Sequence, residues 1–316
     1  MDRGNETTVI QITEFILVGL TDKSELQAPL FLLFLLIYTV TVVRNLGMII
    51  LTKIDSHLQT PLYFFLRHLA LTDLGYSTSI GPKMLVNFVV EKNIISYNWC
   101  ATQLFVFMTF MISEFFILSA MAYDRYVAIC KPLLYMVIMS DIVCLALVAI
   151  PYIYSIFVSL LIVVKIFTLS FCDSNVIKHF YCDTLPILSL LCSDTQEIEL
   201  IVFIFCALNL LSSLMIVLIS YILILVAILR MNSAAGRHKA FSTCFSHLTV
   251  VVVFYGTLLF MYLQPQSSHS FETDQMASVF YTLVIPMLNP LIYSLRNKEV
   301  KNALKRTIEN QCKFIL

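Results

Sequence analysis

The chain is poor in charged residues, and this excludes most classes of soluble protein. Only 13% of its 316 residues are Asp, Glu, Lys or Arg, whereas 59% are hydrophobic and the mean hydropathy is +0.87. A soluble domain carries about 25% charged residues and roughly 45–50% apolar ones. A chain with so little charge cannot cover its surface for water, so lipid must serve as its solvent. The sequence therefore predicts an integral membrane protein.

Other classes are excluded by features that the sequence lacks. The net charge is zero and the pI is near 7.0, which gives no indication of a nucleic-acid partner. No H-E-x-x-H, G-x-S-x-G or phosphate-loop motif indicates an enzyme. The repeated halves expected of a transporter are missing. Residues 1–25 have no long apolar run, so we expect no cleavable signal peptide, and the first apolar helix should act as a signal anchor.

Seven apolar runs have the length that crosses a bilayer. A hydrocarbon core of about 30 Å needs roughly 20 apolar residues per helix. The runs are Pro29–Thr52, Leu58–Pro82, Asn93–Tyr123, Ile142–Val164, Leu200–Leu229, Ala240–Leu263 and Gln275–Leu295. The last four contain no Asp, Glu, Lys or Arg at all. We therefore predict an all-α membrane protein with a seven-transmembrane helix bundle.

Two independent features predict the orientation of the bundle. Asn5 lies in an N-glycosylation triplet, Asn-Glu-Thr, which can be used only if the N-terminus lies outside. With seven spans the C-terminus then lies inside. Twelve Lys and Arg residues fall in the inner segments and six in the outer ones, as the positive-inside rule requires. We predict an extracellular N-terminus (1–25), a seven-helix domain (26–295) and a cytoplasmic tail (296–316).

The tail and the outer cysteines carry two further signals. Val300, Ala303 and Leu304 recur at helical spacing among basic residues, which predicts a short amphipathic helix on the inner leaflet. Four cysteines fall on the outer side, where disulfides form. They are Cys100, Cys172, Cys182 and Cys192. Four cysteines allow three pairings, and spacing alone does not choose among them.

Four motifs in chain order resemble olfactory receptors. Residues 61–66 read P-L-Y-F-F-L, residues 121–130 read M-A-Y-D-R-Y-V-A-I-C, residues 239–244 read K-A-F-S-T-C with S-H at 246–247, and residues 286–293 read P-M-L-N-P-L-I-Y. The chain is similar to the class II, tetrapod type of this family of rhodopsin-like G protein-coupled receptors, from about residue 13 to residue 306.

The resemblance implies a function and its residues. It implies a plasma-membrane receptor that binds small odorants in a transmembrane pocket and activates a stimulatory heterotrimeric G protein of the olfactory type, which raises cyclic AMP. It implies the disulfides Cys100–Cys182 and Cys172–Cys192. The implied pocket residues are Phe107, Met108, Met111, Ile112, Cys206, Asn209, Tyr255, Leu258, Leu259, Tyr262, Val279 and Thr282. The implied coupling and switch residues are Asp124, Arg125, Tyr126, Asn289, Pro290 and Tyr293.

The third span has one chemically graded face. Phe107 and Arg125 are 18 residues apart, which is five helical turns or about 27 Å, and Met111 and Glu114 fall near the same stripe. The face is apolar outside, acidic midway and cationic inside. Residues 101–113 contain no charge, so no carboxylate is available there to anchor an amine. A small, mostly apolar, neutral ligand is therefore predicted.

Asp73 and Glu114 place two acids at membrane depth. Such acids are costly there and are candidates for a function. Two nearby carboxylates cannot cheaply both ionise, so either they share a proton or a cation lies between them. The resemblance to rhodopsin-like receptors suggests sodium, with Asn45, Asn289 and Ser119 as supporting residues. No other cofactor is expected.

Helix-breaking residues indicate where the last two spans can bend. Pro286 and Pro290 interrupt the hydrogen-bond ladder of the seventh span. The sixth has no proline, and Gly256 is its obvious weak point.

The chain departs from the family pattern most seriously at Arg44, which occupies the place of a usual glycine. Gln59 and Leu62 are milder departures. Arg44 either points inward and pairs with Asp73, or faces lipid and lowers the folded fraction; we favour lipid, because the adjacent Asn45 is the residue expected to face Asp73. These departures leave open an alternative function, a receptor-like membrane protein with impaired or lost signalling.

Overall fold

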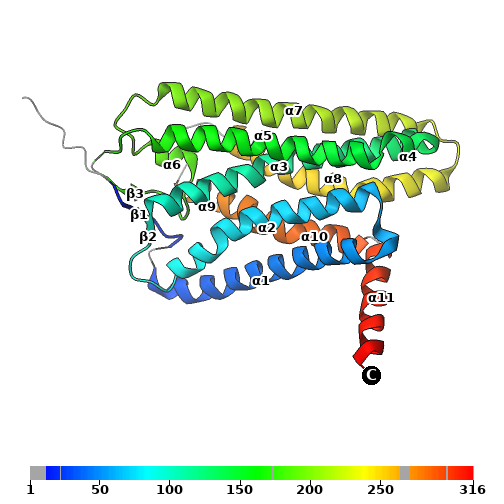
Figure 1. Cartoon of the computed structure of the whole chain (residues 1–316), viewed down its shortest axis with the longest axis horizontal. Helices are drawn as coiled ribbons and strands as arrows, with labels where there is room; N and C mark the ends of the chain where they lie inside the picture. Colours follow the sequence, from blue (N-terminus) through cyan, green and yellow to red (C-terminus); the bar gives the residue numbers. More distant parts are fainter. Residues whose placement is uncertain (1–11, 22, 173, 264–270, 297, 316) are drawn as a thin grey trace, which may run out of the picture.

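The computed structural model describes residues 12–21, 23–172, 174–263, 271–296 and 298–315. Its long helices run side by side along one axis (Figure 1). These helices are α1 (Ser24–Ile54), α2 (Pro61–Asn87), α3 (Tyr97–Cys130), α5 (Asp141–Phe167), α7 (Gln196–Leu229) and α8 (Ala234–Leu263), followed by the segment α9 (Phe271–Val279), η4 (Phe280–Val284) and α10 (Ile285–Arg296). The predicted helical membrane bundle is confirmed.

Most of these helices are long and apolar enough to cross a membrane by length and composition. In the described part of the chain, α1, α3, α5, α7 and the stretch Gln275–Tyr293 meet this test, and the two parts of α8 meet it together. The remaining helix, α2, carries Arg67, Asp73 and Lys83. It runs along the bundle between α1 and α3 and packs on both (Figure 1). It is therefore the seventh long helix of the described bundle, although it does not itself meet the test of length and composition.

The third span, α3, is the central helix of the bundle. Of its apolar stretch 72% is buried against other helices, compared with 11% for α1. Helices α2, α5 and α7 all pack on α3. Its polar residues Ser113, Glu114 and Asp124 are fully buried. Of the spans that meet the test of length and composition by themselves, α3 is therefore the most buried.

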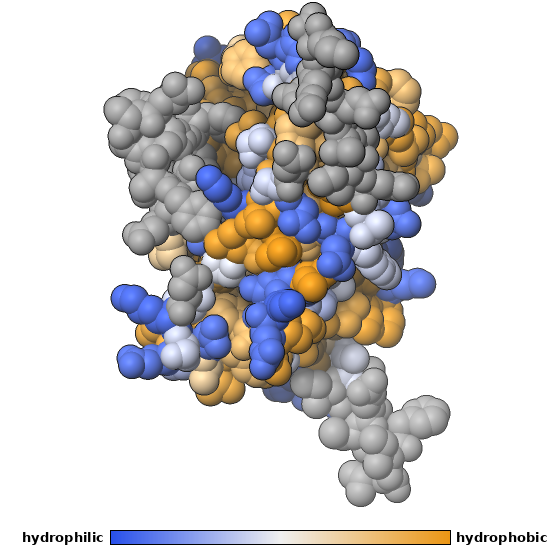
Figure 2. Space-filling view, turned by 90° about the vertical axis from the view of Figure 1, so that its left-hand side faces the viewer, coloured by the Kyte–Doolittle hydropathy of each residue, from blue (hydrophilic) through white to orange (hydrophobic). Residues whose placement is uncertain are grey.

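The end of the bundle that is expected to lie outside the cell, called the outer end below, contains a small sheet that the sequence analysis did not predict. Strand β1 (Glu14–Leu17) pairs antiparallel with β2 (Ile94–Ser96) and parallel with β3 (Val176–Ile177). Phe15 and Leu17 of β1 are buried, and Phe15 packs on Tyr97 and Phe171. The expected polar N-terminal segment is thus partly folded into this end. Figure 2 views the same end, where hydrophilic and apolar residues are interspersed.

The opposite end, which is expected to face the cytosol and is called the inner end below, carries the predicted amphipathic helix. This helix, α11 (Lys298–Ile315), turns away from the bundle axis (Figure 1). The short elements η1 (Ser56–Leu58), η2 (Pro132–Leu134) and α4 (Tyr135–Ile138) join the helices here, and α6 (Thr184–Leu188) lies in the outer loop. Arg306 of α11 pairs with Asp55 at 2.8 Å. Burial opposes the charge of Asp55, but hydrogen bonds from Arg306 and from the His57 backbone hold its pKa below its usual value.

Candidate functional site

Two disulfides hold the long outer loop. The structure joins Cys100, in the first turn of α3, to Cys182 with an S–S distance of 2.00 Å, and both residues are fully buried. It also joins Cys172 to Cys192, whose Cα atoms are 5.0 Å apart. These are the pairings implied by the family resemblance. The first bond fixes the loop to the top of α3, and the second closes the loop on itself.

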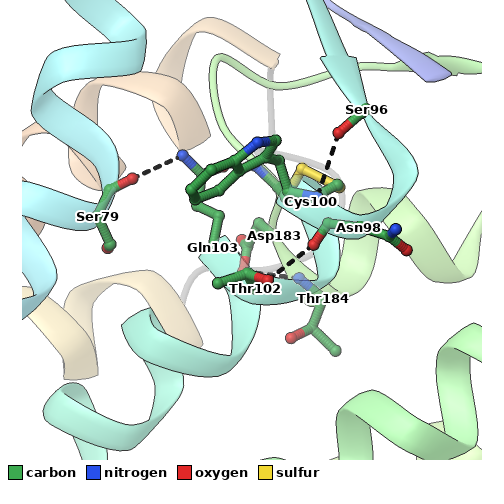
Figure 3. The surroundings of a disulfide bond; sticks show 10 residues. Ser79, Ser96, Asn98, Cys100, Thr102, Gln103, Asp183 and Thr184 are labelled. Carbon is green, nitrogen blue, oxygen red and sulfur yellow. Dashed lines mark hydrogen bonds between the residues drawn. A yellow bond between two sulfur atoms is a disulfide. The ribbon is translucent and has the colours of Figure 1, made fainter.

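Gln103 extends this connection to a third element. Its Nε2 donates to the carbonyl oxygen of Ser79 on α2 at 2.8 Å, and its Oε1 accepts from the backbone N–H of Cys182 at 2.9 Å. Figure 3 shows Gln103 reaching from α3 towards Ser79, beside the disulfide. One buried side chain therefore links α2, α3 and the outer loop.

The predicted odorant-binding residues divide into two groups. Phe107, Met111, Tyr255 and Leu258 are buried in one cluster, with Met108 and Val279 partly buried against it. Ile112 packs in a neighbouring cluster with residues of α5 and the outer loop, and Cys206 and Met108 pack against that cluster. Asn209 and Thr282 are buried, and Leu259 is partly buried. The side chain of Tyr262 lies outside the described residues.

Two tyrosines that the sequence analysis did not predict, Tyr181 and Tyr281, lie beside the first group, which contains Phe107. The Tyr181 ring lies 5.4 Å from that of Phe107, and the Tyr181 hydroxyl is hydrogen-bonded to that of Tyr281 at 2.8 Å. Burial, with help from nearby Asp183, raises the pKa of Tyr181 well above its usual value, so the hydroxyl stays neutral. Position 181 adjoins a bridged cysteine. That was the available signal, because the family resemblance implied a bond between its neighbour Cys182 and Cys100 at the top of α3.

The two buried acids, Asp73 and Glu114, both accept hydrogen bonds from the side-chain amide of Asn289. Asn289 Nδ2 donates to Asp73 Oδ1 at 3.0 Å and to Glu114 Oε1 at 3.2 Å, and the Tyr76 hydroxyl donates to Asp73 at 3.3 Å. All three members of the Asp73–Glu114–Asn289 set are buried. Ser119 lies elsewhere: its hydroxyl donates to the carbonyls of Phe115 and Ser213 and so joins α3 to α7.

Asn45 has a different partner from the expected one. In the described part of the chain it makes no hydrogen bond to Asp73; its amide donates to the Pro286 carbonyl at 3.0 Å and to the Thr41 carbonyl at 3.0 Å. Pro290 has no N–H, so it leaves the carbonyl four residues earlier, that of Pro286, without its helical donor. Asn45 supplies the missing donor. This contact ties α1 to the point where the seventh span is interrupted.

The seventh span also contains one wide turn. Residues Phe280–Val284 form a π-helical segment directly before α10. Pro286 in α10 cannot donate to the carbonyl of Thr282, and its ring crowds that carbonyl. Such π segments are frequent at functional sites. This one lies between Val279 and Asn289 and contains Thr282, another predicted pocket residue.

At the inner end, Arg125 is held by its neighbour. Its Nε donates to Asp124 Oδ2 at 3.0 Å, its Nη2 contacts the same oxygen, and both residues are buried. Asp124 also accepts from the Tyr135 hydroxyl at 2.7 Å. Tyr135 of α4 was not predicted, since the sequence offered no sign that this loop would fold back on α3. Arg125, a predicted coupling residue, is thus buried and paired with Asp124.

Three more of the predicted coupling and switch residues are at least partly buried. The Tyr293 hydroxyl is buried and has no hydrogen-bond partner in the described part of the chain. Pro290 is also buried, and Tyr126 is partly buried. The glycosylation candidate Asn5 lies outside the described residues.

Arg44 is exposed on the outer face of α1, whereas the adjacent Asn45 is 1% exposed. The structure therefore supports the lipid-facing orientation over pairing with Asp73. Gln59, another departure, has a local use: its amide donates to the carbonyls of Thr52 and Lys53 at the end of α1. Such bonds satisfy carbonyls that a helix end leaves unpaired.

Comparison with known proteins decides the family. The family described as olfactory receptor matches residues 34–311. Olfactory receptor 8K3 of Homo sapiens is 72% identical over 316 residues, which is the full length of both chains. Olfactory receptor 8K1 of Homo sapiens is 70% identical, covering 98% of this chain and 97% of that protein. The chain belongs to the olfactory receptor family.

Membership settles the broad function. The chain is an odorant receptor and a multi-pass membrane protein, not an enzyme. A mouse relative, olfactory receptor 8U3 of Mus musculus, is 59% identical over 304 residues, which is 96% of this chain and 95% of that protein. The alternative of a receptor-like protein without signalling is not favoured by such full-length similarity.

Proposed function

We propose that this olfactory receptor binds small, neutral, mostly apolar odorants between α3, α7, α8 and the seventh span, beneath Tyr181. The observation that carries the proposal is the buried cluster of Phe107, Met111, Tyr255 and Leu258. The cluster is apolar, and the hydrogen-bonded hydroxyls of Tyr181 and Tyr281 lie beside it. Apolar walls with a few fixed polar groups are typical of sites for small organic ligands.

The absence of a fixed charge on this part of α3 defines the ligand class. No residue between Tyr97 and Ser113 is charged, and the first acid along α3, Glu114, is engaged by Asn289. An amine would have to bury its charge without a partner, which is costly. An odorant of about ten heavy atoms could reach roughly micromolar affinity, about −8 kcal/mol.

A cyclic AMP assay in transfected cells tests this ligand class. Alcohols, esters and ketones would be compared with amines of the same carbon skeleton. Neutral compounds should include the activators, and the matched amines should be inactive at the same concentrations. Activation by amines with no response to any neutral compound would contradict the proposal.

The proposed orientation places residues 1–25 outside the plasma membrane and residues 296–316 in the cytosol, on either side of the seven-helix domain (26–295). Arg125 then lies at the inner end of α3, where we propose that it couples to a stimulatory heterotrimeric G protein. Its pairing with Asp124, which also accepts a hydrogen bond from the Tyr135 hydroxyl, supports a resting state that must open. Tyr126, Asn289, Pro290 and Tyr293 are proposed to take part in this switch.

The acid pair suits either of two occupants. Glu114 Oε2 and Asn45 Oδ1 are buried and accept no hydrogen bond from the described residues. Carboxylate and amide oxygens are good ligands for a hard cation, so Asp73, Glu114, Asn45 and Asn289 could hold sodium, which would neutralise the two carboxylates. A proton shared by Asp73 and Glu114 would relieve the same repulsion. Both proposals make the two acids one electrostatic unit.

A further inference from the structure

A second concave site lies outside the proposed odorant pocket. A groove of about 790 Å³ runs between α2 and α3 and is bounded at its outer end by β2. Of the predicted odorant-binding residues whose side chains are described, none lines it. Its volume is within the range of about 300–1,000 Å³ that is usual for small-molecule sites.

The groove is graded from apolar to polar. Its inner part is lined by Leu71, Leu74 and Val106, and its outer part includes Lys83 and Ser96. The residues from Leu71 to Lys83 span twelve positions of α2, about 18 Å at 1.5 Å per residue. That length is close to the depth of one leaflet, about half of a 30 Å hydrocarbon core.

The groove opens to lipid at the level of the membrane interface. Leu71 is 42% exposed and Trp99 is 69% exposed, and both line it. Tryptophan is enriched at membrane–water interfaces, which fits a position in the first turn of α3. The groove must therefore be filled from the outer leaflet.

Lys83 supplies the charge that selects the occupant. Its side chain is half-buried, and among the described residues it is the only charged one that lines the groove. No described acid lies within ion-pairing distance of it. A cation held at the membrane edge beside an apolar channel is complementary to an anionic head on an apolar chain. The volume suits one chain and not the two chains of a phospholipid.

We propose that this groove binds a long-chain carboxylic acid from the outer leaflet. The carboxylate pairs with Lys83, and the acyl chain lies along Leu74 and Val106 towards Leu71. Ser79 and Gln103 also line the groove. Gln103 is hydrogen-bonded both to Ser79 and to the backbone of Cys182 (Figure 3). The occupant therefore contacts the side chain that links α2 and α3 to the outer loop.

Photolabelling tests the proposal on the full-length receptor in phosphatidylcholine nanodiscs. The probe is a long-chain fatty acid that carries a photoactivatable diazirine. Labelled peptides should come from α2 and α3, and excess unlabelled fatty acid should compete, whereas the alcohol of equal chain length should not. Equal competition by the alcohol or by lysophosphatidylcholine would overturn the assignment, because the groove would then hold ordinary boundary lipid.

Matched variants separate the site from general effects on folding. Lys83→Gln should lower labelling about tenfold, as expected for loss of a charge-assisted hydrogen bond, while Lys83→Arg should retain it. Lys92→Gln is the control at an exposed outer lysine. Thr102→Trp should fill the groove and abolish labelling, whereas Thr39→Trp on the lipid face of α1 should not. Unchanged labelling in both Lys83→Gln and Thr102→Trp, at equal yields of monodisperse receptor, would refute the site.

Discussion

Arg44 offers a test of how this receptor meets the membrane. It lies nine residues before Lys53, about 13.5 Å along α1. That is near the middle of a hydrocarbon core of about 30 Å. Its side chain is exposed on the bundle surface, so lipid surrounds it. Snorkelling carries the guanidinium only partway to the interface.

The magnitude follows from this depth. Arginine at a helix centre costs about 2.5–3.5 kcal/mol on insertion scales, and leucine contributes about −0.3 to −0.6 kcal/mol. Arg44→Leu should therefore favour insertion by roughly 3–4 kcal/mol and raise the surface level of the receptor. Leucine is the better test than glycine, because glycine inside a helix adds a cost of about 1 kcal/mol.

Surface staining of an N-terminal tag measures this effect, with cyclic AMP recorded in the same cells. Lys53→Leu is the matched control, because Lys53 lies at the inner interface and its charge is already solvated. The odorants that activate should be the same in Arg44→Leu and in the parent receptor. A flat surface level with a shift in basal cyclic AMP would show that Arg44 faces inward, and would refute the lipid-facing account.

Three further predictions concern the two disulfides, the coupling residue Arg125, and the acid pair Asp73 and Glu114. Cys100→Ser removes a bond between residues 82 apart, which stabilises the fold by about 4–5 kcal/mol through loop entropy, whereas Cys172→Ser removes one with a separation of 20, worth about 3 kcal/mol. The surface level should therefore fall more in Cys100→Ser than in Cys172→Ser, and equal losses would contradict this prediction. Arg125→Lys keeps a cation beside buried Asp124 but loses the planar fork, so cyclic AMP should fall while surface level is kept; a normal response at normal surface level would argue against coupling through Arg125. Effects of Asp73→Asn and Glu114→Gln on basal signalling should be non-additive in the double variant, and strict additivity would indicate two independent sites.

The sequence was sufficient for the helices and their order, because each span is a local apolar run whose length the bilayer dictates. The sequence was insufficient to predict contacts between residues that lie far apart in the chain. Pro290 indicates that the helical hydrogen bonding of the seventh span is interrupted. No neighbouring residue indicates that Asn45 donates to the carbonyl of Pro286, which this interruption leaves free. Likewise, the strand Glu14–Leu17 sits in a polar segment and becomes ordered only against β2 and β3.

The bend of the sixth span shows a second limit. Gly256 was the expected weak point, but the two parts of α8 that meet at 41° are Ala234–Ser242 and Cys244–Leu259. Gly256 is exposed, and an added Cβ there would meet no atom within 4 Å. Helix propensity is a weak guide within a packed bundle, because tertiary contacts decide where a helix bends.

The candidate site was partly predictable for the same reason. Phe107, Met111 and Glu114 lie on one stripe of a single helix, so periodicity alone places them together. Tyr181 and Tyr281 come from a loop and from another helix, and only the fold brings their hydroxyls to 2.8 Å.

A cyclic AMP concentration–response curve for Phe107→Ala tests the central claim, that odorants bind in the cluster beneath Tyr181. Phe107 is 6% exposed within the bundle, whereas Phe157 on α5 is 62% exposed to lipid, so Phe157→Ala is the matched control. Burying a phenylalanine side chain contributes about 1.5–3 kcal/mol, so Phe107→Ala should raise the half-maximal odorant concentration about ten- to hundredfold. Phe157→Ala should leave the curve unchanged. Identical curves for the parent and both variants, at equal surface levels, would contradict the account.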